Sequence, residues 1–99
     1  MKLMTKAIEK RVPPLNSEKE LKPIAKFFNP VGAATWIMCE YDPETKTAFG
    51  WCKMFHGCGE YGYFSLDELA SVRLPLGLKI ERDLYFNYKT MDEAIKANE

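Results

Sequence analysis

The segment 73–86, RLPLGLKIERDLYF, holds three adjacent ionisable residues in an otherwise apolar run: Glu81, Arg82 and Asp83. Two carboxylates two positions apart on a strand share a face, where they could bind a metal ion or act as an acid–base pair. No third carboxylate or histidine stands nearby in the sequence to complete such a site. We therefore predict no catalytic residue, and we rank an enzyme built on these three residues behind the non-enzymatic alternatives.

A structural ion pair is a second use for Arg82. On a strand, Arg82 would be the one charged member of an apolar face, and Glu40 would be the odd member of a face shared with Trp36 and Met38. A bidentate contact between Glu40 and Arg82 would satisfy both groups as water is removed. The alternative is that Arg82 extends into solvent at a sheet edge.

One group of residues has zinc-ligand chemistry. Cys52, His56 and Cys58 form C-x3-H-x-C, and Cys39 stands on the preceding predicted strand. Thiolates and imidazole are the ligands that zinc prefers, but structural zinc sites usually open with two cysteines two to four residues apart. Buried cysteines also serve as small core residues. We favour that role, and we predict neither a metal nor another cofactor; Cys52 with His56 also lacks the motif of a cysteine nucleophile.

Aromatic residues alternate with a lysine along two predicted strands: Phe49, Trp51, Lys53 and Phe55 in the first, Tyr61 and Tyr63 in the second. Aromatic rings interleaved with cations bind single-stranded nucleic acid, because the rings stack on bases and the cations neutralise phosphates. A buried core against helices is the alternative for one of the two sheet faces. Six residues are the candidate contacts: Trp51, Lys53, Tyr61, Tyr63, Arg73 and Arg82.

Composition sets the class of protein. The chain has 99 residues, of which 46% are hydrophobic and 28% charged, as expected for a single globular domain over 1–99. The net charge is zero, but residues 1–30 carry seven Lys or Arg against three Glu (+4), which leaves seven against eleven acidic residues (−4) for 31–99. This asymmetry would suit an acidic partner or polyanion, although we favour a self-complementary surface.

The chain has no apolar run long enough to cross a membrane and no apolar core of a signal peptide near its N-terminus. Three cysteines are an odd number, and disulfides are not expected in a reducing compartment. We therefore predict a cytoplasmic protein with no membrane partner.

Hydrophobic alternation and turn residues predict an α+β fold with an antiparallel meander of four to five strands. The predicted strands cover 25–28, 34–42, 47–55, 60–64 and 80–86. Short helices are predicted at the N-terminus (6–11, capped by Thr5), after strand four (66–72, capped by Ser65 and Glu68) and at the C-terminus (from Thr90 and Glu93). Ser17 and Glu20 have the same capping spacing and predict one further short helix before Pro23.

Several pieces of the chain together carry a family resemblance: MKLMTKAIEKRVPPL, KFFNP, ATWIMCEYDPETKTAFG, YGYFSLDEL and SVRLPLGLKIERDLYF. On these pieces, which run from the first residue to Phe86, the chain resembles the bacterial family catalogued as domain of unknown function 2958. The turn HGCG at 56–59 does not look like a family feature, whereas Arg73, Gly77, Glu81, Arg82 and Asp83 lie in the closing family-like stretch. The family carries no established activity. Its members are similar to cargo of plasmids and integrating conjugative elements, which implies nucleic acid or a DNA-processing protein as partner.

The prediction from sequence is therefore a non-enzymatic binding module of mobile genetic elements, with nucleic acid as the leading ligand. An interaction or inhibitor protein that acts on another protein ranks second, and an enzyme third. The sequence leaves the oligomeric state open.

Overall fold

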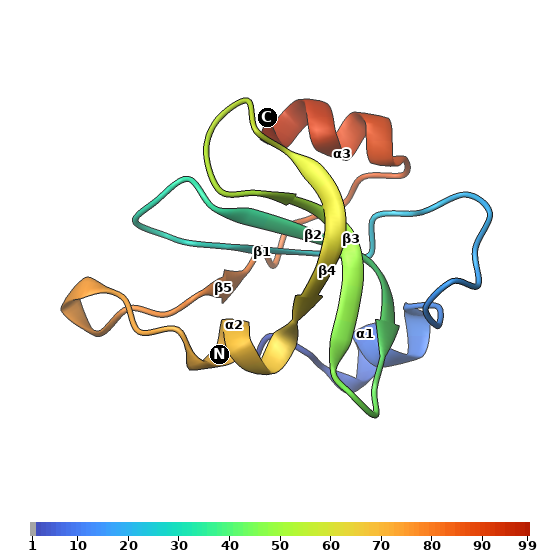
Figure 1. Cartoon of the computed structure of the whole chain (residues 1–99), viewed down its shortest axis with the longest axis horizontal. Coiled ribbons are helices and arrows are strands. Elements are labelled where there is room, and N and C mark those ends of the chain that lie inside the picture. Colours follow the sequence, from blue (N-terminus) through green and yellow to red (C-terminus); the bar gives the residue numbers. More distant parts are fainter. Residues whose placement is uncertain (1) are drawn as a thin grey trace.

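The computed structural model describes residues 2–99, and an antiparallel sheet of five strands forms its centre (Figure 1). The strands are β1 (Ala25–Phe28), β2 (Thr35–Asp42), β3 (Thr47–Lys53), β4 (Glu60–Ser65) and β5 (Glu81–Arg82). Their order in the sheet is β4-β3-β2-β1-β5, so β1 to β4 form the predicted meander and β5 pairs with the outer side of β1. The predicted α+β class is confirmed.

Helices cover both faces of this sheet (Figure 1). Helices α1 (Lys6–Arg11) and α2 (Leu66–Ser71) pack on one face, and α3 (Met91–Asn98) packs on the other. The core of the α1/α2 face includes Phe27, Trp36, Met38 and Ala48. The core of the α3 face contains Ile37, Cys39, Trp51, Met91 and Ala94.

Each helix begins at its predicted cap. The side chains of Thr5, Ser65 and Thr90 accept hydrogen bonds from the backbone amides of Ile8, Glu68 and Glu93, each three residues ahead. These bonds satisfy amides that have no partner within the first helical turn. The helix predicted from Ser17 and Glu20 is wrong, because that segment is irregular and the Ser17 hydroxyl donates to the carbonyl of Pro14.

A β-bulge in β2 decides which residues share a face. Met38 pairs with Gly50 and Glu40 pairs with Phe49, so Cys39 is the extra residue. The bulge reverses the alternation, and Glu40 lies on the α3 face although Trp36 and Met38 lie on the α1/α2 face. The prediction that these three residues share a face is therefore wrong. Gly50 is required here, because a Cβ would lie 1.8 Å from the carbonyl oxygen of Ile37.

Two strands are shorter than predicted. Strand β3 ends at Lys53, so Phe55 lies in the following loop and is 70% exposed. Strand β5 ends at Arg82, because the Asp83 carboxylate accepts from the amide of Tyr85 and turns the chain. The prediction of a strand over 80–86, with Leu84 and Phe86 on its apolar face, is therefore wrong for the residues after Arg82.

No helix within residues 2–99 has the length and apolar character that a membrane crossing requires.

Candidate functional site

Three aromatic side chains meet on the α3 face at the free edge of the sheet. Phe49 on β3 pairs with Tyr63 on β4, and the buried Trp51 on β3 pairs with Tyr61 on β4. The rings of Phe49, Tyr61 and Tyr63 therefore point to the same face as the Trp51 ring. The ring centroids of Phe49 lie 6.1 Å from Tyr61 and 4.8 Å from Tyr63. Tyr61 is 45% exposed and Tyr63 is 59% exposed. We call Phe49, Tyr61 and Tyr63 the tyrosine surface.

Charged side chains surround Tyr61. Tyr61 lines a hollow of about 400 Å³ with Glu20 and Asp92, and with Lys19 as the one basic group. Partial burial raises the pKa of the Tyr61 phenol, and the nearby Cys39 and Asp92 raise it further. Glu20 has a cation of its own, since Lys22 lies 3.6 Å from its carboxylate. Asp92 is thus the carboxylate that can meet a ligand beside Tyr61.

Two of the predicted nucleic-acid contacts are covered. Trp51 is 4% exposed in the α3 core, and its indole lies so close to Gly59 that a Cβ there would be 1.9 Å from the ring. Lys53 is 6% exposed, and its ammonium donates to the carbonyl of Asn98 at the end of α3. Neither the Trp51 ring nor the Lys53 stem is available for stacking on an extended ligand.

The two predicted arginine contacts lie elsewhere. Arg73 donates to the carbonyls of Ala70, Ser71 and Val72 at the end of α2. Arg82 lies on the α1/α2 face opposite Phe27 and donates to the carbonyls of Lys2 and Leu3. The structure therefore brings Tyr61 and Tyr63 together, but it gives them neither Arg73 nor Arg82.

The predicted Glu40–Arg82 pair is replaced by separate contacts. Glu40 is 3% exposed, and its carboxylate accepts hydrogen bonds from the amides of Asn16 and Glu18, at 3.0 and 3.1 Å. The bulge at Cys39 places Glu40 on the face opposite Arg82. Arg82 is also in register with Trp36, four residues before Glu40, which adds about 13 Å along the strand.

The three residues of the third alternative also lie apart, because Arg82 points to the α1/α2 face while Glu81 and Asp83 lie on the other face. Asp83 lies 3.9 Å from the ammonium of Lys26, whereas Glu81 pairs in the sheet with Phe28. A hollow of about 260 Å³ beside α1 is lined by Arg82 and Asp83 but not by Glu81. The three side chains do not converge on one concave site.

The cysteines and His56 do not converge either. Cys39 lies in the α3 core, whereas Cys52 pairs with Trp36 and packs on the α1/α2 core. Burial raises the pKa of the Cys39 thiol to about 12 and that of Cys52 to about 11, which keeps both protonated at neutral pH. Cys58 is exposed. Residues 2–99 contain no group of three or more His, Cys, Asp or Glu residues arranged to hold a metal ion.

Comparison with known proteins adds a family. The model described as "Protein of unknown function (DUF2958)" matches residues 1–96. The chain belongs to this family. No curated protein and no solved structure matches this DUF2958 chain.

Sequence reasoning missed two features of this DUF2958 member. The first is the free edge of β4. The strand order that places β4 outermost cannot be predicted from any local sequence pattern. The second is a hollow of about 390 Å³ at one end of the sheet, which Lys26, Phe28, Lys53 and His56 help to line. The alternation of Lys26 with Phe28 on a short strand was the one available signal.

Proposed function

We propose that this protein is a non-enzymatic module that binds an extended segment of another protein along β4. The observation that carries the proposal is a six-residue strand at the free edge of the sheet, with two exposed tyrosines on one of its faces. An edge strand offers unpaired amides and carbonyls to an incoming strand, and side-chain surfaces beside it supply specificity.

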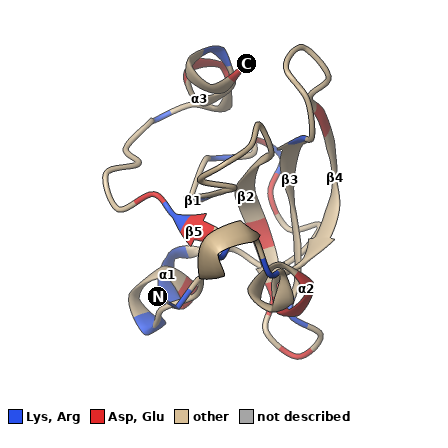
Figure 2. Ribbon diagram, turned by 90° about the vertical axis from the view of Figure 1, so that its left-hand side faces the viewer, with Lys and Arg blue, Asp and Glu red and all other residues tan. Residues whose placement is uncertain are grey.

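The two edges of the sheet differ in how they are protected. Strand β5 is two residues long, and Asp83 turns the chain immediately after it. Strand β4, EYGYFS, has no lysine, no proline and no bulge in its pairing with β3. Figure 2 shows β4 at the margin of the molecule, uncharged except at its start. Short strands, charges, prolines and bulges are the usual devices that keep an edge from pairing.

The chemistry around β4 favours a basic partner segment. Tyrosines contribute large contact areas at protein interfaces at a low entropic cost, and their faces attract Lys and Arg. Asp92 lies beside Tyr61, and Glu60 begins β4. Glu60 pairs with Cys52 and therefore points to the face opposite the rings. An extended segment with alternating basic and apolar residues would pack its apolar side chains on the rings and direct its basic side chains toward Glu60, and a basic residue on the ring face would meet Asp92.

Single-stranded nucleic acid is the competing ligand, and the same geometry favours it less. Phosphates need cations beside the stacking rings. The lysine predicted for this purpose, Lys53, is buried, and the two arginines lie on other parts of the molecule. A DNA-processing protein, the partner class implied by the family resemblance, suits the protein-binding proposal.

The test is a selection of short random peptides displayed on phage against the immobilised protein. We expect enrichment of peptides in which basic and apolar residues alternate. Tyr63→Ser should weaken the binding of a selected peptide about tenfold or more, as at interface hot spots. Tyr85→Ser is the matched control, because Tyr85 is 92% exposed and lies beyond β5. A selected peptide can be methylated on its odd-numbered or on its even-numbered backbone amides. Only one of these two sets should abolish binding, because an added strand bonds to β4 through every second amide.

Two results would contradict the proposal. One is selected peptides whose affinity is the same for the wild type and Tyr63→Ser. The other is salt-dependent binding of labelled single-stranded DNA, by fluorescence polarisation, that Tyr63→Ser abolishes while no peptide is enriched; that result would favour the nucleic-acid alternative.

A further inference from the structure

A buried lysine lies at one end of the sheet. Lys53 is the last residue of β3, and its pairing with Thr35 directs it to the α3 face. There its ammonium donates to the backbone carbonyl of Asn98, in the last turn of α3. The carbonyl end of a helix carries partial negative charge and attracts a cation. This contact explains why the lysine points inward.

One carbonyl does not complete the coordination of this ammonium. A lysine carries three N–H donors and a full positive charge. The ion pairs formed among residues 2–99 use Lys22, Lys26 and Lys46, and none of them includes Lys53. A buried charge without a counter-charge is costly, and an anion beside it would recover part of that cost.

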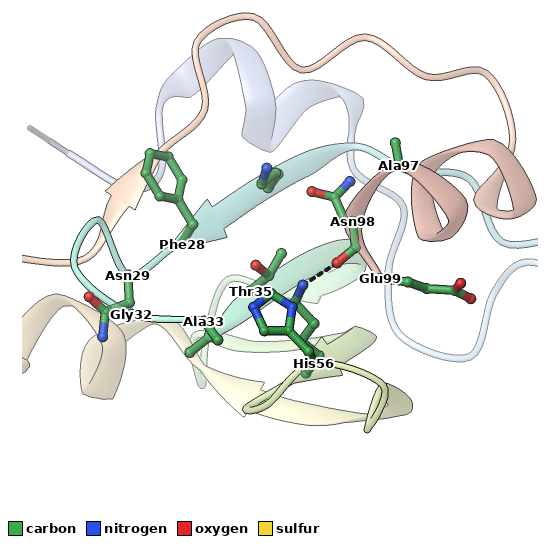
Figure 3. Close-up of a pocket in the computed structure, with 12 residues that line it drawn as sticks. Phe28, Asn29, Gly32, Ala33, Thr35, His56, Ala97, Asn98 and Glu99 are labelled. Carbon is green, nitrogen blue, oxygen red and sulfur yellow. Dashed lines mark hydrogen bonds between the residues drawn. The ribbon is translucent and has the colours of Figure 1, made fainter.

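The space for such an anion is present. A hollow of about 390 Å³ opens beside Lys53, between the β1–β2 loop, the β3–β4 loop and the end of α3 (Figure 3). Thr35, His56 and Asn29 contribute polar groups, and Phe28 contributes an apolar wall. Small-molecule sites of this size combine an apolar lining with a few convergent polar groups.

A second lysine lines the same hollow. Lys26 lies on β1, two residues before Phe28, and both side chains point to the α3 face. Its ammonium lies 5.5 Å from the centroid of the Phe28 ring and 3.9 Å from the carboxylate of Asp83. The ion pair is long and partly exposed, so it restrains Lys26 only weakly.

The acidic groups near the hollow do not fill it. Asp83 is engaged with Lys26, and Glu99 is one of the residues that line the hollow. Figure 3 shows the Glu99 side chain directed away from the contact at Asn98, while His56 lies beside that contact. Neither carboxylate forms an ion pair with Lys53.

We propose that this hollow binds a small organic anion, with its carboxylate or phosphate group on Lys53 and Lys26 and its apolar part against Phe28. Thr35 and His56 line the same hollow, and we assign their hydroxyl and imidazole groups as further hydrogen-bond donors to the anion. The site uses no residue of the tyrosine surface, so a test of this site does not decide the proposed function.

The test is a titration of the ¹⁵N-labelled protein with inorganic phosphate, and separately with benzoate, at constant ionic strength. We expect saturable shifts of the amide signals of Thr35, His56 and Asn98 with at least one of the two probes. Saturation with phosphate alone assigns a phosphate ester, and saturation with benzoate assigns a carboxylate with an apolar body. Lys53→Met and Lys26→Met should each weaken binding about tenfold or more, since each removes one charge-assisted contact.

Lys46→Met is the matched control, because Lys46 lies in the β2–β3 turn and pairs with Asp67. It should leave the affinity unchanged. The absence of saturable shifts with both probes, or equal affinities for the wild type and Lys26→Met, would overturn the proposal. Lys26→Met decides the matter even if Lys53→Met fails to fold, because Lys26 is only half-buried.

Discussion

The carboxylate of Glu40 accepts a hydrogen bond of 3.1 Å from the backbone amide of Glu18, and one of 3.0 Å from that of Asn16. Two acidic residues are thus joined through the backbone of one and the side chain of the other. The contact fixes the irregular segment between α1 and β1 onto the middle of β2, next to the bulge at Cys39. Glu40 therefore has a structural role, which it performs through backbone hydrogen bonds and not through the predicted ion pair with Arg82.

Glu40→Gln should lower the free energy of unfolding by about 2–3 kcal/mol. The side-chain amide of Gln keeps one acceptor oxygen, but its NH₂ group would face a backbone N–H that has lost its acceptor. Urea denaturation followed by circular dichroism measures this loss. Glu44→Gln, in the exposed β2–β3 turn, should change the stability by no more than about 0.5 kcal/mol. Equal stabilities of the two variants would show that the contacts of Glu40 do not matter.

Gly50→Ala should destabilise the protein by about 2–4 kcal/mol, since the new methyl group would meet the carbonyl oxygen of Ile37 at 1.8 Å. Gly62→Ala is the matched control on the neighbouring strand. Gly62 pairs directly with Gly50, but a Cβ there has no atom within 4 Å. Thermal unfolding of both variants tests the bulge; a loss of the same size at Gly62 would contradict this account.

The three cysteines should differ in reactivity. An aromatic disulfide reagent at neutral pH should modify Cys58 rapidly, because it is exposed, and Cys39 and Cys52 only after unfolding. Absorbance of the released thiolate measures the rates. Cys58→Ser should abolish the fast phase, and a remaining fast phase would mean that the sheet opens to the reagent.

Alkaline pH should destabilise the fold through Cys39. Burial raises the pKa of its thiol from 9.0 to about 12, so the unfolded chain loses this proton first. The stabilisation is complete below pH 9 and is lost as the pH rises toward 12, and its full size is about 4 kcal/mol at 1.36 kcal/mol per pKa unit.

Urea denaturation between pH 8 and 11, in a reducing buffer, measures this loss. Cys39→Ala removes the titrating group, so its stability should fall less steeply with pH than that of the wild type. Parallel slopes for the two proteins would exclude the thiol as the cause.

The helix caps show what local sequence can predict. Thr5, Ser65 and Thr90 each bond the amide three residues ahead, and such a contact depends only on the residues of one turn. Ser17 has the same local signal and forms no helix, and its hydroxyl donates to the carbonyl of Pro14 instead of accepting from an amide three residues ahead. The amides on both sides of Ser17, those of Asn16 and Glu18, donate to Glu40 on β2, so contacts with a distant strand hold this segment in an irregular conformation.

Sequence alone determined the class of the fold, the meander of the first four strands and the starts of all three α-helices. These follow from alternation, turn residues and caps, which act between near neighbours in the chain. Only the tertiary structure decided that Trp51 and Lys53 are buried, that Tyr61 and Tyr63 stay exposed, and that Glu40 and Arg82 lie on opposite faces. The physical reason is that burial and register depend on which strands pair, where one bulged residue reverses a face, and which face α3 covers.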